Sequence, residues 1–203
     1  MKPLPPSAEH APDHGVFRAA LRREKLAARL ALAPAAHAAL SAALERHLAA
    51  LLLPLAPQTL AFCAAVRGEF DARPLAVRLI ERGWHAAMPV VTEKNAPMSF
   101  RAWTPSADMS TDRYGIPIPQ NGAGLIPDIV LLPLVAFDAQ GFRLGYGGGY
   151  FDRTLAAMVP RPQAIGVGFE LGQVPDIRPE AHDIGLDVVV SEAGARRFPR
   201  ISP

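Results

Sequence analysis

The sequence predicts an α/β fold: a single-domain layered sandwich with a mostly parallel sheet flanked by helices. Short apolar runs alternate along the chain with segments of helical periodicity, which is typical of layered α/β domains. The strongest strand signal, Asp128–Phe137, is an almost unbroken apolar run, as expected of a strand covered on both faces in a parallel sheet. The chain has 203 residues, the size of one domain, and half of them are apolar, so it can bury a large core.

Composition is that of an intracellular globular protein. The proline-rich residues 1–12 are expected to form a loose tail, residues 13–192 a single domain, and residues 193–203 a C-terminal tail. Cys63 is the only cysteine, which excludes an internal disulfide and a cysteine-based zinc site. The longest apolar stretch, Leu48–Leu55, is far shorter than the roughly 20 residues that span a bilayer. We therefore expect a cytoplasmic protein with no membrane partner.

The first half of the chain predicts two helices followed by alternating elements. Asp13 is a candidate N-cap, because apolar residues recur at helical spacing from Val16 to Leu30. A second helix is predicted over Ala35–Leu53, between two prolines. The elements predicted next are a strand over Thr59–Val66, a helix over Pro74–Arg82, and strands over Ala86–Val91 and Met98–Thr104.

The second half contains a long irregular segment ahead of the strand Asp128–Phe137. Residues 105–127 are rich in proline and glycine, and we expect them to form a functional loop or lid rather than a linker between domains. A helix over Tyr150–Val159 and strands over Ala164–Phe169 and Leu186–Val190 complete the predicted sandwich.

The charge pattern favours small-molecule partners over nucleic acid. The formal net charge is only +2. Nucleic-acid-binding proteins usually carry a clear basic stripe with interleaved aromatic residues. The only candidate here, Arg18–Arg29, lies on a predicted helix, where charges most often form a solvated face. We expect no nucleic-acid partner, and the sequence leaves the oligomeric state open.

The segment Arg143–Arg153 (RLGYGGGYFDR) carries the strongest functional signal. It leads from a predicted buried strand into a predicted helix, and its glycines allow backbone N–H groups to approach a phosphate closely. The start of the helix adds unpaired N–H donors and a partial positive charge. The flanking arginines suit phosphate, and Asp152 suits Mg²⁺. A glycine cluster alone also suits a hinge or a tight turn, but this context favours a loop that binds nucleotide phosphates.

The segment matches neither of two common nucleotide-binding motifs. No Gly-Lys-Ser/Thr sequence follows the glycines, so the segment is not a P-loop. Tyr150 occupies the third glycine position of the dinucleotide fingerprint, which argues against a nicotinamide-dependent dehydrogenase.

Further motifs accompany this segment along the chain. PLVAFD precedes it and HDIGLD follows it. Upstream lie an LRxxxxxxR motif (Leu21-Arg22 to Arg29), Gly68–Asp71 (GEFD) and Tyr114–Pro119 (YGIPIP). Together these motifs resemble the 5-formyltetrahydrofolate cyclo-ligase family, also called the 5,10-methenyltetrahydrofolate synthetases. The resemblance is dense from Asp128 to Leu155 and patchy over about residues 18–190.

The resemblance implies an ATP- and Mg²⁺-dependent ligase that converts 5-formyltetrahydrofolate to 5,10-methenyltetrahydrofolate. In this family the formyl oxygen attacks the γ-phosphate, N10 then attacks the activated carbon, and phosphate leaves. An amide oxygen is a poor leaving group, so phosphorylation explains the need for ATP. Phosphoryl transfer requires mainly positioning and charge stabilisation, which a glycine loop, arginines and Mg²⁺ supply.

The resemblance also implies roles for individual residues. The implied ATP-binding residues are Arg18, Arg22, Arg143, Leu144, Gly145, Tyr146, Gly147, Gly148, Gly149, Tyr150 and Phe151. The implied catalytic residues are Arg143 and Tyr150. The implied folate-binding residues are Ala64, Glu69, Tyr114 and Tyr150, and the implied Mg²⁺ ligands are Asp152 and Asp183.

Residue types and spacing alone leave simpler roles open for several of these positions. Asp183 also suits a turn or a cap. Arg18 and Arg22 lie four residues apart on one helix face and also suit an exposed basic surface. Tyr114 and Tyr150 suit the walls of a ring-binding pocket, but an aromatic residue near a strand end often belongs to the core.

Three positions depart from the family pattern. Phe151 stands where many members have a second tyrosine, Gly148 where some have a lysine, and Ile118 where Glu or Gln is common. The alternative functions are a nucleotide- or sugar-phosphate-binding enzyme of the same fold, and a non-enzymatic folate- or RNA-binding module.

Overall fold

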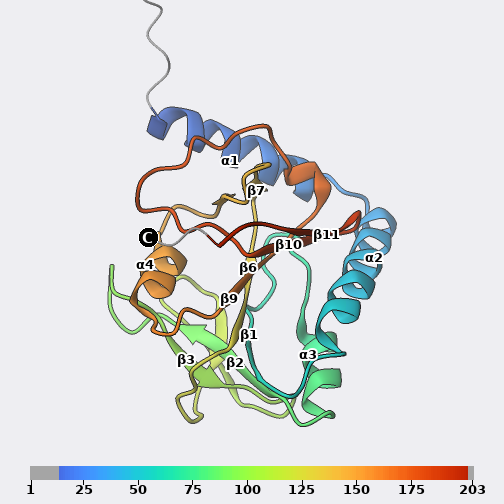
Figure 1. Ribbon diagram of the computed structural model, residues 1–203, viewed down its shortest axis with the longest axis vertical. Helices are drawn as coiled ribbons and strands as arrows, with labels where there is room; N and C mark the ends of the chain where they lie inside the picture. Colours follow the sequence, from blue (N-terminus) through green and yellow to red (C-terminus); the bar gives the residue numbers. More distant parts are fainter. Residues whose placement is uncertain (1–13, 201–203) are drawn as a thin grey trace, which may run out of the picture.

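The computed structural model describes residues 14–200, and a seven-stranded sheet forms its centre (Figure 1). The strand order is β11-β10-β9-β6-β1-β2-β3, in which every pair from β10 to β2 is parallel and the two edge strands are antiparallel. The strands are β1 (Thr59–Ala61), β2 (His85–Val90), β3 (Ser99–Ala102), β6 (Ile129–Pro133), β9 (Gln163–Val167), β10 (Val188–Ser191) and β11 (Gly194–Arg197). The predicted α/β sandwich with a mostly parallel sheet is confirmed.

The central strands supply side chains to a core on each face of the sheet. Leu131 packs in the core beneath α2 (Pro34–Leu52) and α3 (Arg73–Ile80), whereas its neighbour Leu132 packs in the core beneath α4 (Tyr150–Ala157). Successive strand residues point to opposite faces, so an unbroken apolar sequence is what a doubly covered strand requires. Figure 1 shows α2 and α3 on one side of the sheet and α4 on the other.

Helix α1 (His14–Leu30) crosses the top of the sheet in Figure 1. Its Leu21 packs against a small antiparallel pair formed by β7 (Ala136–Phe137) and β8 (Arg143–Leu144). A 3₁₀ turn, η1 (Glu170–Gly172), also lies against α1. The helix therefore covers the region that follows β6, where the glycine-rich segment begins.

Residues 105–127, predicted as a loop or lid, contain a short hairpin. Strands β4 (Met109–Thr111) and β5 (Pro117–Pro119) pair in antiparallel register. The Asp112 carboxylate closes the turn by accepting the backbone N–H groups of Tyr114 and Ile116 at 2.8 and 2.9 Å. Asp residues favour such turns because their side chains bond the backbone two residues on.

The ends of two predicted segments are corrected by the structure. The strand predicted over Thr59–Val66 ends at Ala61, because its parallel pairing with β6 ends there. Part of the tail predicted over residues 193–203 is strand β11, which pairs with β10 from Gly194 to Arg197. The predicted tail 1–12 and the Asp13 cap lie outside the described residues.

A helix able to cross a bilayer by itself is not found among residues 14–200. Only α1 and α2 taken together meet the length and composition test, and the chain bends by 105° between them.

Candidate active site

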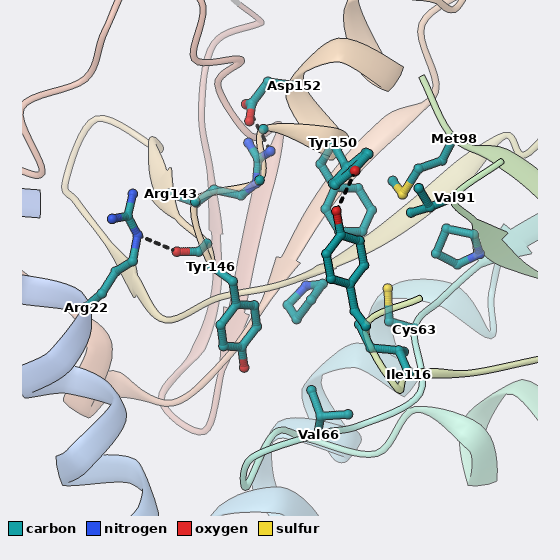
Figure 2. Close-up of a pocket in the computed structure, with 18 of the residues that line it drawn as sticks. Arg22, Cys63, Val66, Val91, Met98, Ile116, Arg143, Tyr146, Tyr150 and Asp152 are labelled. Carbon is teal, nitrogen blue, oxygen red and sulfur yellow. Dashed lines mark hydrogen bonds and ion pairs between the residues drawn. The ribbon is translucent and has the colours of Figure 1, made fainter. Parts of the chain in front are cut away.

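A cavity of about 840 Å³ lies where the central parallel strands end. Residues just after or at the ends of β1, β2 and β6 line it, including Cys63, Val66, Val91 and Pro133 (Figure 2). Ligands of open α/β sheets usually bind at the carboxyl ends of the strands. The cavity therefore occupies the expected position for a substrate site.

The glycine-rich segment forms one wall of this cavity, as the sequence predicts. Gly147 and Gly149 have φ angles of +92° and +62°, which favour glycine over residues with a side chain. Arg22 of α1 donates from Nε to the Gly145 carbonyl at 2.8 Å, which holds the loop against the helix (Figure 2). A Cβ on Gly147 would lie 3.5 Å from the Arg22 Cζ atom. That distance is an ordinary van der Waals contact, so the backbone conformation rather than lack of space explains glycine at this position.

Helix α4 begins directly after the loop at Tyr150. The first N–H groups of a helix lack partners within the helix, and the helix dipole makes this end partially positive. Asp152 lies in the first turn. The loop and the helix start therefore present backbone donors to one region of the cavity wall, which suits an anion.

Arg143 and Asp152 form an ion pair beside the loop. The Arg143 Nη2 atom lies 2.9 Å from Asp152 Oδ1, and Arg143 Nη1 donates to the Ile184 carbonyl at 3.0 Å. Asp152 Oδ1 also accepts the Ile184 N–H at 3.1 Å. These bonds fix both side chains next to the segment that carries Asp183.

A second ion pair joins α1 to that segment. Arg18 donates to the two Asp183 carboxylate oxygens at 2.7 and 3.1 Å, and Glu180 Oε1 lies 3.3 Å from Arg18 Nη1. Burial acts to raise the pKa of Asp183. The hydrogen bonds from Arg18 and from the Glu180 backbone N–H, together with the Arg18 charge, lower the pKa by more than burial raises it, so the net pKa lies below its ordinary value. Asp183 is therefore held as a carboxylate at the cavity.

Tyr114 and Tyr150 meet across the cavity mouth. Their hydroxyl oxygens lie 2.7 Å apart and their rings pack edge to face with centroids separated by 5.9 Å. The shared hydrogen bond lowers the pKa of Tyr150 and raises that of Tyr114. The β4–β5 hairpin is thereby tied to the first residue of α4.

Three residues implied as site residues do not line the cavity. Ala64 and Leu144 are buried in hydrophobic clusters. Glu69 is also buried, and its carboxylate accepts the Tyr146 hydroxyl at 2.5 Å and the Val66 N–H at 3.1 Å. Burial raises the pKa of Glu69. Tyr146 of the glycine loop thus lies between Glu69 and the rest of the site.

The other implied residues converge on the cavity. Its lining includes Arg18, Arg22, Tyr114, Arg143, Gly145, Tyr146, Gly147, Gly148, Gly149, Tyr150, Phe151, Asp152 and Asp183. Segments more than a hundred residues apart in the sequence therefore meet in one place, as the resemblance implies.

Sequence reasoning missed part of a cationic row on α1. Arg18, Arg22, Lys25 and Arg29 recur every three or four residues, so they share one helix face. Arg18 and Arg29 are buried, and both are directed into the protein rather than to solvent. The spacing is visible in the sequence, and the expectation of a solvated face is wrong for Arg18 and Arg29, which are buried.

The acidic groups fit Mg²⁺ only together with a phosphate ligand. Within residues 14–200, no group of three or more His, Cys, Asp or Glu side chains is placed to hold a metal. Mg²⁺ is commonly bound by one or two carboxylates, with substrate phosphates and waters completing the octahedron. Asp152 and Asp183 provide two such carboxylates on the cavity lining.

The curated proteins that this chain resembles carry the same name. The chain is 32% identical over 140 residues to a 5-formyltetrahydrofolate cyclo-ligase of Escherichia coli, covering 66% of this chain and 77% of the relative. It is 28% identical over 148 residues to the protein of that name from Mycolicibacterium smegmatis, covering 68% and 76%.

Comparison with solved structures leads to the same family. The fold superposes on the 5,10-methenyltetrahydrofolate synthetase of Aquifex aeolicus with a TM-score of 0.78 and 26% identity, covering 92% of this chain and 95% of that one. A Mycoplasma pneumoniae protein at 23% identity shares the fold, with a TM-score of 0.70 over 86% of this chain and 98% of the other. The sequence model of the 5-formyltetrahydrofolate cyclo-ligase family matches residues 15–192, nearly the whole chain. This protein therefore belongs to the 5-formyltetrahydrofolate cyclo-ligase family and is a ligase.

Proposed function

We propose that this protein uses ATP and Mg²⁺ to cyclise 5-formyltetrahydrofolate to 5,10-methenyltetrahydrofolate. One observation carries the proposal: the glycine loop meets Arg18, Arg22, Arg143, Asp152 and Asp183 at a single cavity at the ends of the parallel strands. Those are the groups that phosphoryl transfer requires, since it depends on positioning and charge stabilisation rather than on a protein nucleophile.

The phosphates of ATP would lie along the glycine loop and the start of α4. Arg22 and Arg143 both line the cavity together with this loop, so their positive charges would offset the negative charge of the transferring phosphoryl group. The formyl oxygen of the substrate forms a bond to the γ-phosphorus, while the bond from that phosphorus to the β,γ-bridging oxygen breaks and ADP leaves. N10 then forms a bond to the formyl carbon and loses its proton to water, and the carbon–oxygen bond breaks to release phosphate.

Asp152 and Asp183 would hold the Mg²⁺ ion, which supplies charge neutralisation to the phosphates when bound. Each carboxylate is paired with an arginine, Asp152 with Arg143 and Asp183 with Arg18. The arginines thus hold both carboxylates in place on the cavity lining. We propose that the arginines exchange part of this contact for phosphate oxygens.

The folate rings would occupy the part of the cavity beneath the β4–β5 hairpin. Val66, Met98 and Ile116 form an apolar lining there, with the Tyr150 ring beside it (Figure 2). The Tyr114 ring packs against Tyr150. Such a lining excludes water and suits flat aromatic groups. Tyr150 lies next to both the glycine loop and this apolar region, which supports its proposed place near the reacting atoms.

The purified protein, given 5-formyltetrahydrofolate and MgATP, is expected to produce the near-ultraviolet absorbance of the methenyl product. Parallel reactions without ATP, and with a chelator in place of Mg²⁺, are expected to give no signal. Release of one phosphate for each product formed would support the phosphorylated intermediate. Absence of product at high enzyme concentration, with all components present, would rule out the proposed activity.

A further inference from the structure

Arg29 is buried at the far end of the cationic row of α1, and it contacts three segments of the chain. Its Nη1 donates to the Leu134 carbonyl at 2.8 Å, and its Nε donates to the Arg67 carbonyl at 3.0 Å. Its Nη2 donates to the Tyr146 hydroxyl at 2.7 Å. One guanidinium therefore joins the segment after β1, the segment after β6 and the glycine loop.

The contact to Tyr146 continues to Glu69. The Tyr146 hydroxyl accepts from Arg29 and donates to Glu69 Oε1, which itself lies 3.7 Å from Arg29 Nη2. The Arg29 and Glu69 side chains are each only 6% exposed, so water has little access to the chain of bonds. A buried charge is tolerated when it is paired and hydrogen-bonded. In this chain of bonds the Arg29 guanidinium is paired with Glu69 and hydrogen-bonded to Tyr146, which lie on two separate segments.

Arg29 also supports the backbone turn at Arg67, whose carbonyl accepts a hydrogen bond from Arg29 Nε. Glu69 N–H bonds the Val66 carbonyl at 3.1 Å, and the two residues between them, Arg67 and Gly68, have φ angles of +50° and +73°. Positive φ at both central residues defines a turn that favours glycine, asparagine or aspartate, so arginine at the first position is disfavoured. Arg29 bonds the Arg67 carbonyl and packs against Gly68, where an added Cβ would lie 3.6 Å from Arg29 Cγ.

These segments are two walls of the proposed site. Val66 and Arg67 line the cavity on one side, and Gly145 to Gly149 line it on the other. In the described structure a side-chain hydrogen bond joins the walls at this point, from Tyr146 to Glu69, and the Arg67 guanidinium lies 5.3 Å from the centre of the Tyr146 ring. Arg29 contacts both walls but is not itself part of the cavity lining.

We propose that Arg29 is a positioning residue, which holds Tyr146 onto Glu69 and thereby fixes the glycine loop relative to the Val66–Glu69 turn. This inference rests on the proposed function, because the loop is taken to bind the nucleotide and the turn to border the folate. Lysine cannot replace arginine fully, since an ammonium group lacks the planar fork that reaches three acceptors in different directions.

Kinetic measurements on Arg29→Met test the inference. Loosening the loop and the turn is expected to raise the KM for ATP and for 5-formyltetrahydrofolate and to lower kcat, with kcat/KM falling by about tenfold or more. Arg29→Lys is expected to give an intermediate result. Tyr146→Phe keeps the ring but deletes the hydroxyl, and is expected to change the same constants in the same direction by a smaller factor.

The two substitutions are expected to be non-additive. Arg29→Met combined with Tyr146→Phe should be scarcely worse than Arg29→Met alone, because both remove the same connection. Independent, multiplying effects in the double variant would overturn the inference. Tyr146→Phe conserves most of the buried volume, so it keeps the test decisive if Arg29→Met fails to fold.

Arg196→Met is the matched control for loss of a partly buried ion pair. Arg196 pairs with Glu170 at the β11 edge, and neither residue lines the cavity. Its loss is expected to lower the melting temperature while leaving both KM values unchanged. If Arg29→Met and Tyr146→Phe behave in the same way, Arg29 has a structural role only and the inference fails. If the wild-type protein itself yields no methenyl product, the proposed function fails instead.

Discussion

At the scale of single residues, the site pairs opposite charges within the protein. Arg143 contacts Asp152, and Arg18 contacts Asp183 through two hydrogen bonds. Burying a charge is costly unless it is paired, so these contacts allow the site to hold four charged groups beside a mostly apolar cavity. The same groups would be available to Mg²⁺ and phosphate once ATP enters.

Asp152→Asn is expected to lower kcat by more than about tenfold, equivalent to roughly 1.4 kcal/mol in the activation barrier. The amide keeps the shape of the side chain but removes the charge next to the glycine loop. Initial rates measured over a range of Mg²⁺ concentrations should also show a weaker dependence on the metal. Wild-type turnover with wild-type Mg²⁺ dependence would remove Asp152 from the site.

Asp183→Asn is expected to reduce the acid sensitivity of the fold. The folded-state pKa of Asp183 lies below its ordinary value, so the ionised group stabilises the protein above pH of roughly 4. That stabilisation is lost as pH falls through the lowered pKa. Urea unfolding at a series of pH values should show a smaller loss of unfolding free energy in Asp183→Asn than in wild type. Identical pH dependence in the two proteins would contradict this.

At the scale of elements, the β4–β5 hairpin and α4 close the cavity from two directions. Their link is the Tyr114–Tyr150 hydroxyl contact at 2.7 Å, supported by the edge-to-face ring contact. Tyr114 is 55% exposed, so the contact is open to water and is easily exchanged. We propose that the hairpin opens to admit a substrate and closes over it.

Tyr114→Phe is expected to loosen the hairpin without unfolding it. The ring contact remains, so the KM for 5-formyltetrahydrofolate should rise only about two- to fivefold, in keeping with one exposed hydrogen bond. Hydrogen exchange of residues 109–119 should become faster, while exchange in the central strands stays unchanged. Unaltered exchange in the hairpin would show that the hydroxyl contact does not hold it.

At the scale of the whole molecule, two cores on either face of one sheet hold the site together. The central strand β6 contributes to both, and the glycine loop depends on it because the chain passes from β6 through β7 and β8 into that loop. Stability and the geometry of the site are therefore linked through one strand.

Leu131→Ala is expected to lower the free energy of unfolding by about 2–5 kcal/mol, because it leaves a cavity beneath α2 and α3. Leu131 is 1% exposed, whereas Leu30 is 58% exposed and serves as the control. Leu30→Ala should change the unfolding free energy by less than about 0.5 kcal/mol. Chemical denaturation measures both, and equal effects would refute the assignment of Leu131 to the core.

Local patterns predicted most of the elements and the centre of the site. The apolar run Asp128–Phe137 predicted the buried strand β6, although β6 ends at Pro133 and Ala136–Phe137 forms the separate strand β7. The glycine segment correctly marked the start of α4 at Tyr150. Strand β11 was missed because Gly194–Arg197 has no apolar pattern, and its strand character comes from pairing with β10. The β4–β5 hairpin was missed for a similar reason, since prolines obscure its short strands.

The sequence by itself determined the fold class and the family, because these depend on hydrophobic periodicity and on contiguous motifs such as the glycine segment. Only the tertiary structure decided which charges meet. It placed Arg18 on Asp183, buried Glu69 behind Tyr146, and brought Arg29 to three segments distant in the sequence. Such contacts depend on directions and distances between elements, and these are set by packing of the two cores rather than by any local run of residues.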